Sequence, residues 1–64
     1  MSTRTEIKND IHNMNGLIGK MAFSIDELFD LKKNKEEITN DHLNEIQETF
    51  DEIKETWKKV RSGL

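Results

Sequence analysis

The clearest folding signal of the chain lies in residues 7–28, which read IKNDIHNMNGLIGKMAFSIDEL. Apolar side chains recur in this segment at alternating intervals of four and three residues, at Ile7, Ile11, Met14, Ile18, Met21, Ile25 and Leu28. This spacing keeps them on one face of an α-helix and is typical of helices that pack against other helices. It therefore predicts a long amphipathic helix that buries this face against a helical neighbour.

The ends of this helix are marked by capping residues. Ser2 or Thr3 can begin it, because Thr3 and Glu6 have the spacing of a capping box, in which a hydroxyl and a carboxylate satisfy free backbone amides. The apolar pattern stops at residues 32–37, where lysines suit the negative end of the helix dipole and Asn34 tolerates a left-handed conformation. We expect the helix to run from about residue 3 to about residue 33.

A second helix follows after a short connection. A loop over about 34–38 is the length that joins antiparallel neighbours, and Thr39 can cap a helix over about 39–62, before Gly63. This helix repeats the alternation of three and four with Leu43, Ile46, Phe50, Ile53, Trp57, Val60 and Leu64. We predict a single all-α domain over 1–64, an antiparallel two-helix hairpin with Trp57 in its core.

The hairpin has too little apolar material for a stable core of its own. The chain has 64 residues, of which 33% are hydrophobic, and no cysteine to form a disulfide. The apolar stripe of the first helix is wider than one neighbour can cover, because Leu17, Ala22, Phe29 and Leu31 flank it. We expect a homodimer that forms a four-helix bundle, with the hairpins either parallel or antiparallel.

Composition disfavours several functional classes. A net charge of −3 gives no general attraction to nucleic acid, and no apolar run reaches the length of a membrane span. Residues 1–4 lead into charged residues and do not read as a signal peptide, so we expect a cytoplasmic protein. With no nucleotide-binding loop, nucleophile–base pair or cluster of metal ligands, we expect no cofactor, no metal and no self-contained catalytic site.

One face of the first helix departs from local helix preference. In the heptad frame His12 points to solvent, and Gly16 and Gly19 follow it at i+4 and i+7 on the same face. Each glycine inside a helix costs about 1 kcal/mol relative to alanine, and neither glycine lies in the apolar stripe. Because departures from local consistency fall at functional sites, this face is the candidate site.

The neighbours of His12 fit phosphate chemistry. Glycines one and two turns away let another protein approach the imidazole, and Lys8 at i−4 brings a positive charge to the same face. Asn9 and Asn15, at i−3 and i+3, can hydrogen-bond the ring or phosphate oxygens. The other interpretations are that His12 has no role and that the glycines make room for a protein contact without chemistry.

The segment His12-Asn13-Met14-Asn15-Gly16 resembles the motif of histidine phosphotransfer domains, which reads His, any residue, Leu, Lys, Gly. The whole chain also resembles the dimerisation and histidine-phosphotransfer hairpin of sensor histidine kinases. The resemblance implies that His12 accepts a phosphoryl group from a histidine kinase or the receiver domain of a response regulator. It departs from the motifs at Asn15, which replaces a lysine, and at Asn13, where kinases usually have an acidic residue.

Three further residues are candidates for supporting roles. His42 can support the start of the second helix as a neutral imidazole. Antiparallel pairing brings the end of the second helix beside the His12 region, where Lys58 or Arg61 can supply positive charge. The alternative function is a non-catalytic dimeric regulator or adaptor that binds a partner protein.

Overall fold

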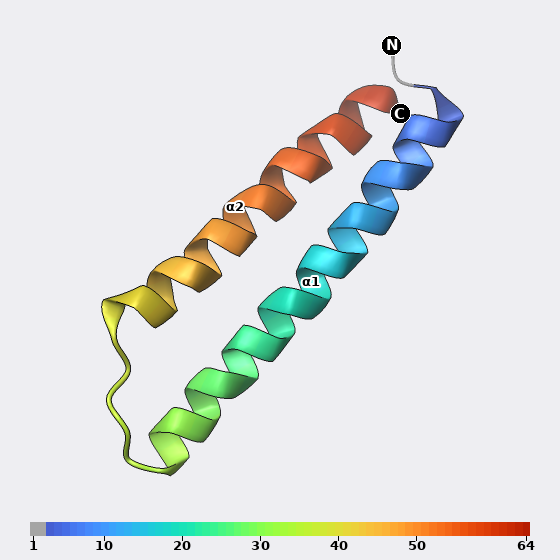
Figure 1. The fold of residues 1–64 in the computed structure, drawn as a ribbon. Coiled ribbons are helices and arrows are strands. Elements are labelled where there is room, and N and C mark those ends of the chain that lie inside the picture. The colour runs from blue at the N-terminus through green and yellow to red at the C-terminus, as the bar shows by residue number, and fades with distance from the viewer. Residues whose placement is uncertain (1–2) are drawn as a thin grey trace.

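The computed structural model describes residues 3–64 and shows two helices, α1 (Arg4–Lys33) and α2 (Asn40–Gly63), packed side by side (Figure 1). The helices run in opposite directions, so the loop lies at one end and both termini lie at the other. The Cα atoms extend over 49 × 16 × 12 Å. The predicted all-α antiparallel hairpin is confirmed; the alternative start at Ser2 lies outside the described residues.

Both ends of α1 are defined by backbone capping. Thr3 is the N-cap, and its hydroxyl oxygen accepts a hydrogen bond from the Glu6 amide at 3.1 Å. At the other end the amides of Lys35 and Glu36 donate to the carbonyls of Lys32 and Leu31, at 3.2 and 2.8 Å, which is a Schellman motif. The prediction that Asn34 adopts the left-handed conformation is wrong, because this motif assigns it to the next position, Lys35, with φ 60°.

The start of α2 is capped by a reciprocal pair. Thr39 is the N-cap, and its backbone amide donates to Nδ1 of His42 at 3.1 Å, while its hydroxyl lies 3.0 Å from the same nitrogen. His42 therefore takes the third helical position of a capping box, where Glu or Gln is usual. Because Nδ1 accepts the bond from the Thr39 amide, the His42 side chain supports the start of the helix, the place that the sequence suggested for it.

Each helix packs against the other through a face that is rotated about the helix axis from the predicted apolar stripe. We call the contact between these two faces the seam. Six of the fourteen residues of the two expected stripes are exposed; Ile11 and Ile18 are 40% and 45% exposed, and Trp57, predicted to be core, is 47% exposed. The less exposed residues of α1, which face α2, are Ile7, Asp10, Met14, Leu17, Met21, Ser24, Ile25, Leu28 and Leu31. Those of α2 are His42, Ile46, Thr49, Ile53, Thr56, Val60 and Gly63.

The most deeply buried positions between the helices carry small or β-branched side chains. The buried residues described are Ser24, Thr49 and Val60, and two of them are polar. The Thr49 hydroxyl donates to the carbonyl of Glu45 at 3.0 Å, which satisfies it inside its own helix. Larger apolar residues such as Leu17 and Ile53 lie beside them between the helices, and the bulkiest, Phe50 and Trp57, lie at the margin of the contact. Within residues 3–64, neither helix has the length and apolar character that crossing a membrane requires.

Candidate functional site: the His12 face of α1

His12 lies on the side of α1 that faces away from α2. The residue is exposed, whereas Met14 and Leu17 line the seam. At about 100° per residue, His12 is displaced by roughly 140–160° around the helix from both of them. The imidazole is therefore presented to solvent, as expected, and α2 does not contribute to its surroundings.

The residues predicted to surround His12 share its face. Because α1 is continuous through this region, each of them lies within about 60° of His12 around the helix axis, and all are exposed. We call this surface the His12 face, and it comprises Lys8, Asn9, His12, Asn15, Gly16, Gly19 and Phe23. No hydrogen bond found within residues 3–64 involves the His12 ring, so Asn9 and Asn15 are near it without holding it.

The two glycines of the His12 face are not required by the fold. A Cβ atom added at Gly16 or at Gly19 would meet nothing within 4 Å. Neither glycine has a positive φ, so the backbone does not require glycine there either. Both positions therefore accept alanine in the isolated hairpin, and what they provide is a bare strip of helix beside His12.

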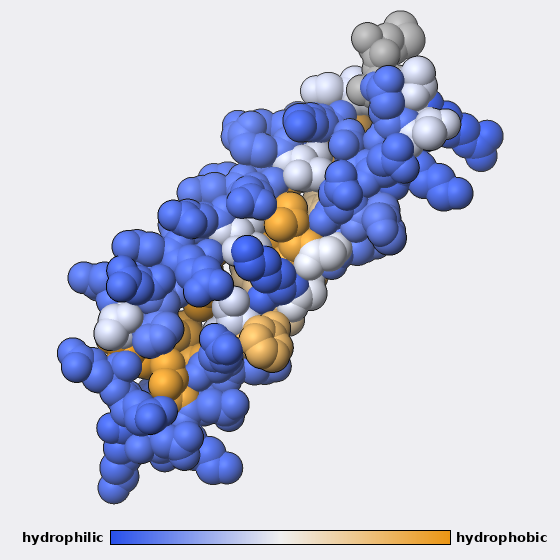
Figure 2. Space-filling model, viewed as in Figure 1, coloured by the Kyte–Doolittle hydropathy of each residue, from blue (hydrophilic) through white to orange (hydrophobic). Residues whose placement is uncertain are grey.

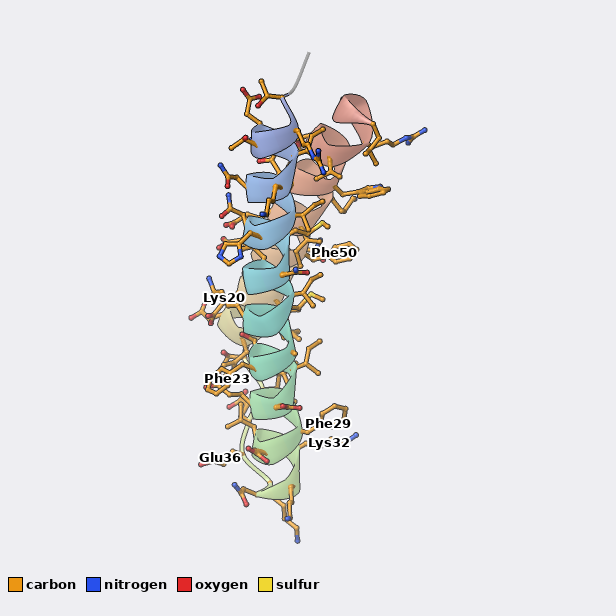
Figure 3. The ribbon with its side chains drawn as sticks, turned by 90° about the vertical axis from the view of Figure 1, so that its right-hand side faces the viewer. Lys20, Phe23, Phe29, Lys32, Glu36 and Phe50 are labelled. Atoms are coloured by element: carbon orange, nitrogen blue, oxygen red, sulfur yellow. The ribbon has the colours of Figure 1, made fainter. Side chains whose placement is uncertain are left out.

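Phe23 completes this face; the helical repeat places it next after Gly16 and Gly19, although it is not among the predicted binding residues. It is 64% exposed and lies within about 20° of His12 around α1, because eleven residues make about three turns. Figure 3 shows Phe23 and Lys20 pointing to one side of the hairpin, opposite to Phe29 and Phe50. The same side faces the viewer in Figure 2, where the surface is mostly hydrophilic and apolar atoms gather between the helices. The i+11 spacing from His12 was the available signal.

The geometry does not support the prediction that the end of α2 supplies positive charge near His12. Lys58 and Arg61 belong to the helix that lies behind α1 as seen from His12, and Lys58 pairs with Glu55 at 3.1 Å. That they supply charge to His12 therefore stays a prediction that the single hairpin does not support. Any positive charge on the His12 face comes from α1 itself, through Lys8.

His42 belongs to a different part of the molecule. It lines a shallow hollow at the loop end, together with Glu27, Asp30, Leu31 and Glu36. Fifteen residues separate Glu27 from His12, which is about 22 Å along α1. The two histidines therefore do not form one site, and within residues 3–64 no three acidic or histidine side chains gather as a metal site would need.

No protein-family model, curated protein or solved structure matches the chain significantly. The functional interpretation therefore depends on the geometry of the His12 face and on the chemistry of its residues.

Proposed function

We propose that the chain is a histidine-phosphotransfer module of a two-component phosphorelay, in which His12 accepts a phosphoryl group and passes it on. The observation that carries the proposal is an exposed imidazole beside two glycines that the fold does not need. A phosphoacceptor histidine must enter the active site of another protein, so bare helix around it has a direct use. The chemical part of the proposal is supported by the resemblance of residues 12–16 to the phosphotransfer motif.

The reaction requires from this chain mainly an accessible imidazole nitrogen. The unprotonated Nε2 of His12 attacks the phosphorus of an aspartyl phosphate in line, a P–N bond forms, and the P–O bond to the aspartate breaks. The carboxylate leaves with the electron pair, and the remaining ring proton stays on Nδ1. Phosphoryl transfer depends mostly on positioning and charge stabilisation, and the donor protein provides the metal and the rest of the site.

Residues of the His12 face have separate tasks in this scheme. The Lys8 ammonium, one turn before His12, stabilises the charge of the phosphoryl oxygens. The side-chain amides of Asn9 and Asn15 flank the ring on its two sides and donate hydrogen bonds to those oxygens. Gly16 and Gly19 leave room for the loops of the partner, and Phe23 gives the partner an apolar contact one turn beyond Gly19.

The partner in this proposal is the receiver domain of a response regulator or the catalytic domain of a histidine kinase. The chain needs one of them because phosphate must be delivered to it. Both classes of partner work in the cytoplasm, which is where the proposal places the chain.

The test is transfer from a receiver domain phosphorylated on its aspartate. Mass spectrometry of the chain after mixing is expected to show one added phosphoryl group, stable in base and lost in acid. His12→Gln removes this product, and His42→Gln, which changes the other histidine, retains it. Phosphate that persists in His12→Gln, or that is absent from the unaltered chain with every donor, contradicts the proposal.

A second candidate, a non-catalytic adaptor, is favoured by the exposure of Phe23. An aromatic ring that is 64% exposed beside a bare helix surface suits a protein contact with or without phosphate. For an adaptor, Gly16→Gln and Phe23→Ser weaken partner binding measured by calorimetry, and His12→Gln leaves it intact. The phosphohistidine measurement separates the two functions, because an adaptor binds its partner without any phosphate appearing on His12.

A further inference from the structure

The side of the hairpin opposite to Phe23 carries a continuous apolar surface that α1 and α2 build together. We call it the outer apolar face, and it consists of Ile11, Ile18, Ile25, Phe29, Leu43, Phe50, Trp57 and Leu64. All of its members except Ile25 are exposed, with Phe29, Phe50 and Trp57 at 67%, 45% and 47%. The spacing is seven residues throughout α2 and between the isoleucines of α1, which is the repeat of helices that pack against other helices.

The two stripes lie on the same side of the molecule. Figure 3 shows Phe29 of α1 and Phe50 of α2 pointing to one side, away from Phe23. The other members follow from helix geometry, because a spacing of seven residues changes the direction by only about 20°. Ile11 and Phe29 are eighteen residues apart, which is five full turns. The face therefore extends along nearly the whole hairpin.

The exposed area is that of a protein with an uncovered interface. The surface of the chain is 5423 Å², and a compact monomer of 7.5 kDa is expected to expose about 4,200 Å². The excess of about 1,200 Å² is larger than the roughly 800 Å² that each partner buries in a standard interface. A hairpin with three buried residues among those described gains most of its missing core by covering this face.

We propose that a second copy of this chain covers the outer apolar face, forming a two-fold symmetric four-helix bundle in which each α2 runs antiparallel to the α2 of its partner. A second copy has a face of the same length and the same heptad repeat, so the two faces match without any further requirement. Two-fold dimers use one patch twice, and here the patch is complementary to itself.

The charges of α2 favour the antiparallel arrangement. Its first half has four acidic residues and no lysine or arginine, at Asp41, Glu45, Glu48 and Asp51. Its second half has four basic residues and two acidic residues, at Glu52, Lys54, Glu55, Lys58, Lys59 and Arg61. When the α2 helices pack antiparallel, each acidic half lies beside a basic half. A parallel dimer packs α2 on α1, whose two halves each carry no net charge, and this attraction is lost.

This dimer does not depend on phosphotransfer, and it leaves the His12 face open. His12 is about 100° around α1 from Ile11, beyond the edge of the outer apolar face. The second copy therefore covers neither the imidazole nor the two glycines. Loss of the dimer and loss of phosphate transfer are separate outcomes, because one is read from mass in solution and the other from phosphohistidine.

The first test compares the same substitution on the two sides of the hairpin by sedimentation equilibrium. Phe50→Glu places a charge in the proposed interface and is expected to raise the dimer dissociation constant by about 100-fold or more. Phe23→Glu makes the same chemical change on the opposite side and is expected to leave the dimer intact. A monomeric unaltered chain, or equal dissociation of both variants, overturns the proposal.

The second test needs no change in the interface, so it remains decisive if Phe50→Glu prevents folding. A spin label on Glu37→Cys marks the loop end of each copy, and pulsed dipolar spectroscopy measures the distance between two labels. The antiparallel dimer places them at opposite ends, at a distance comparable with the 49 Å length of the hairpin. Two labels close together overturn the antiparallel arrangement, and the absence of any dipolar coupling together with a monomeric mass overturns the dimer.

Discussion

The two long sides of α1 contrast in composition and in what they cost the isolated hairpin. One side presents Ile11, Ile18 and Phe29 to solvent, with exposures of 40%, 45% and 67%. The other presents His12 among polar side chains and two glycines at which an added Cβ atom would meet nothing within 4 Å. The first side loses stability by leaving apolar surface in water, and the second by weakening the helix.

This difference indicates two separate uses of one helix. An apolar heptad stripe gains free energy when another helix covers it, and it does so without regard to chemistry. A bare polar strip gains little from being covered, and under the proposed function its composition provides access to His12. We infer that the apolar side serves assembly and that the His12 face serves recognition.

The largest expected effect is on the apolar side. Ile18→Ala is expected to lower the free energy of unfolding by about 3 kcal/mol per chain when a second copy buries this residue. In a single hairpin, where Ile18 is 45% exposed, the loss is about 1 kcal/mol. Urea unfolding at high and low protein concentration distinguishes the two values. The smaller loss at both concentrations would remove the contrast between the two sides.

An opposite change is expected on the His12 face. Gly16→Ala together with Gly19→Ala is expected to raise the free energy of unfolding by about 2 kcal/mol, because each glycine costs about 1 kcal/mol in a helix and each added methyl group has open space. Urea unfolding at fixed protein concentration measures it, and Gly63→Ala, at the end of α2, is the control with a smaller gain. If the double variant is no more stable than the parent, the glycines have a structural role after all.

The smallest effect is expected at Phe23. Because its ring is 64% exposed, Phe23→Ser is expected to change the free energy of unfolding by no more than about 0.5 kcal/mol. Thermal unfolding followed by circular dichroism measures this change. A loss as large as that of Ile18→Ala would place Phe23 in a buried contact and would remove it from the docking surface.

Most of the secondary structure was predictable from local signals. The Thr3 cap, the loop before Thr39 and the alternation of three and four in both helices depend on residues near one another in sequence. The exposure of His12 was also predictable, because a residue between two apolar positions of a heptad points away from the stripe. The same helical repeat places Phe23 on the face of His12, because eleven residues make about three turns.

The orientation of the seam and the surroundings of His12 were not predictable in the same way. A stripe that includes both Ile18 and Leu17 satisfies the helical repeat whichever of them faces α2. The end of α2 is close to the His12 region along the hairpin axis, yet it lies on the other side of α1. Sequence separation and antiparallel pairing specify how far along the hairpin axis a residue lies. They do not specify the side of the helix from which its side chain projects.

The sequence by itself determined two amphipathic helices, their caps and the side of α1 that carries His12, because each depends on backbone preferences and a fixed helical repeat. Only the tertiary structure decided which half of each apolar stripe is buried. Ser24, Thr49 and Val60 take the most deeply buried positions between the helices, whereas the bulkier Phe50 and Trp57 stay at the margin of the contact. A heptad repeat is compatible with more than one rotation of a helix about its own axis, so the repeat alone does not contain that choice.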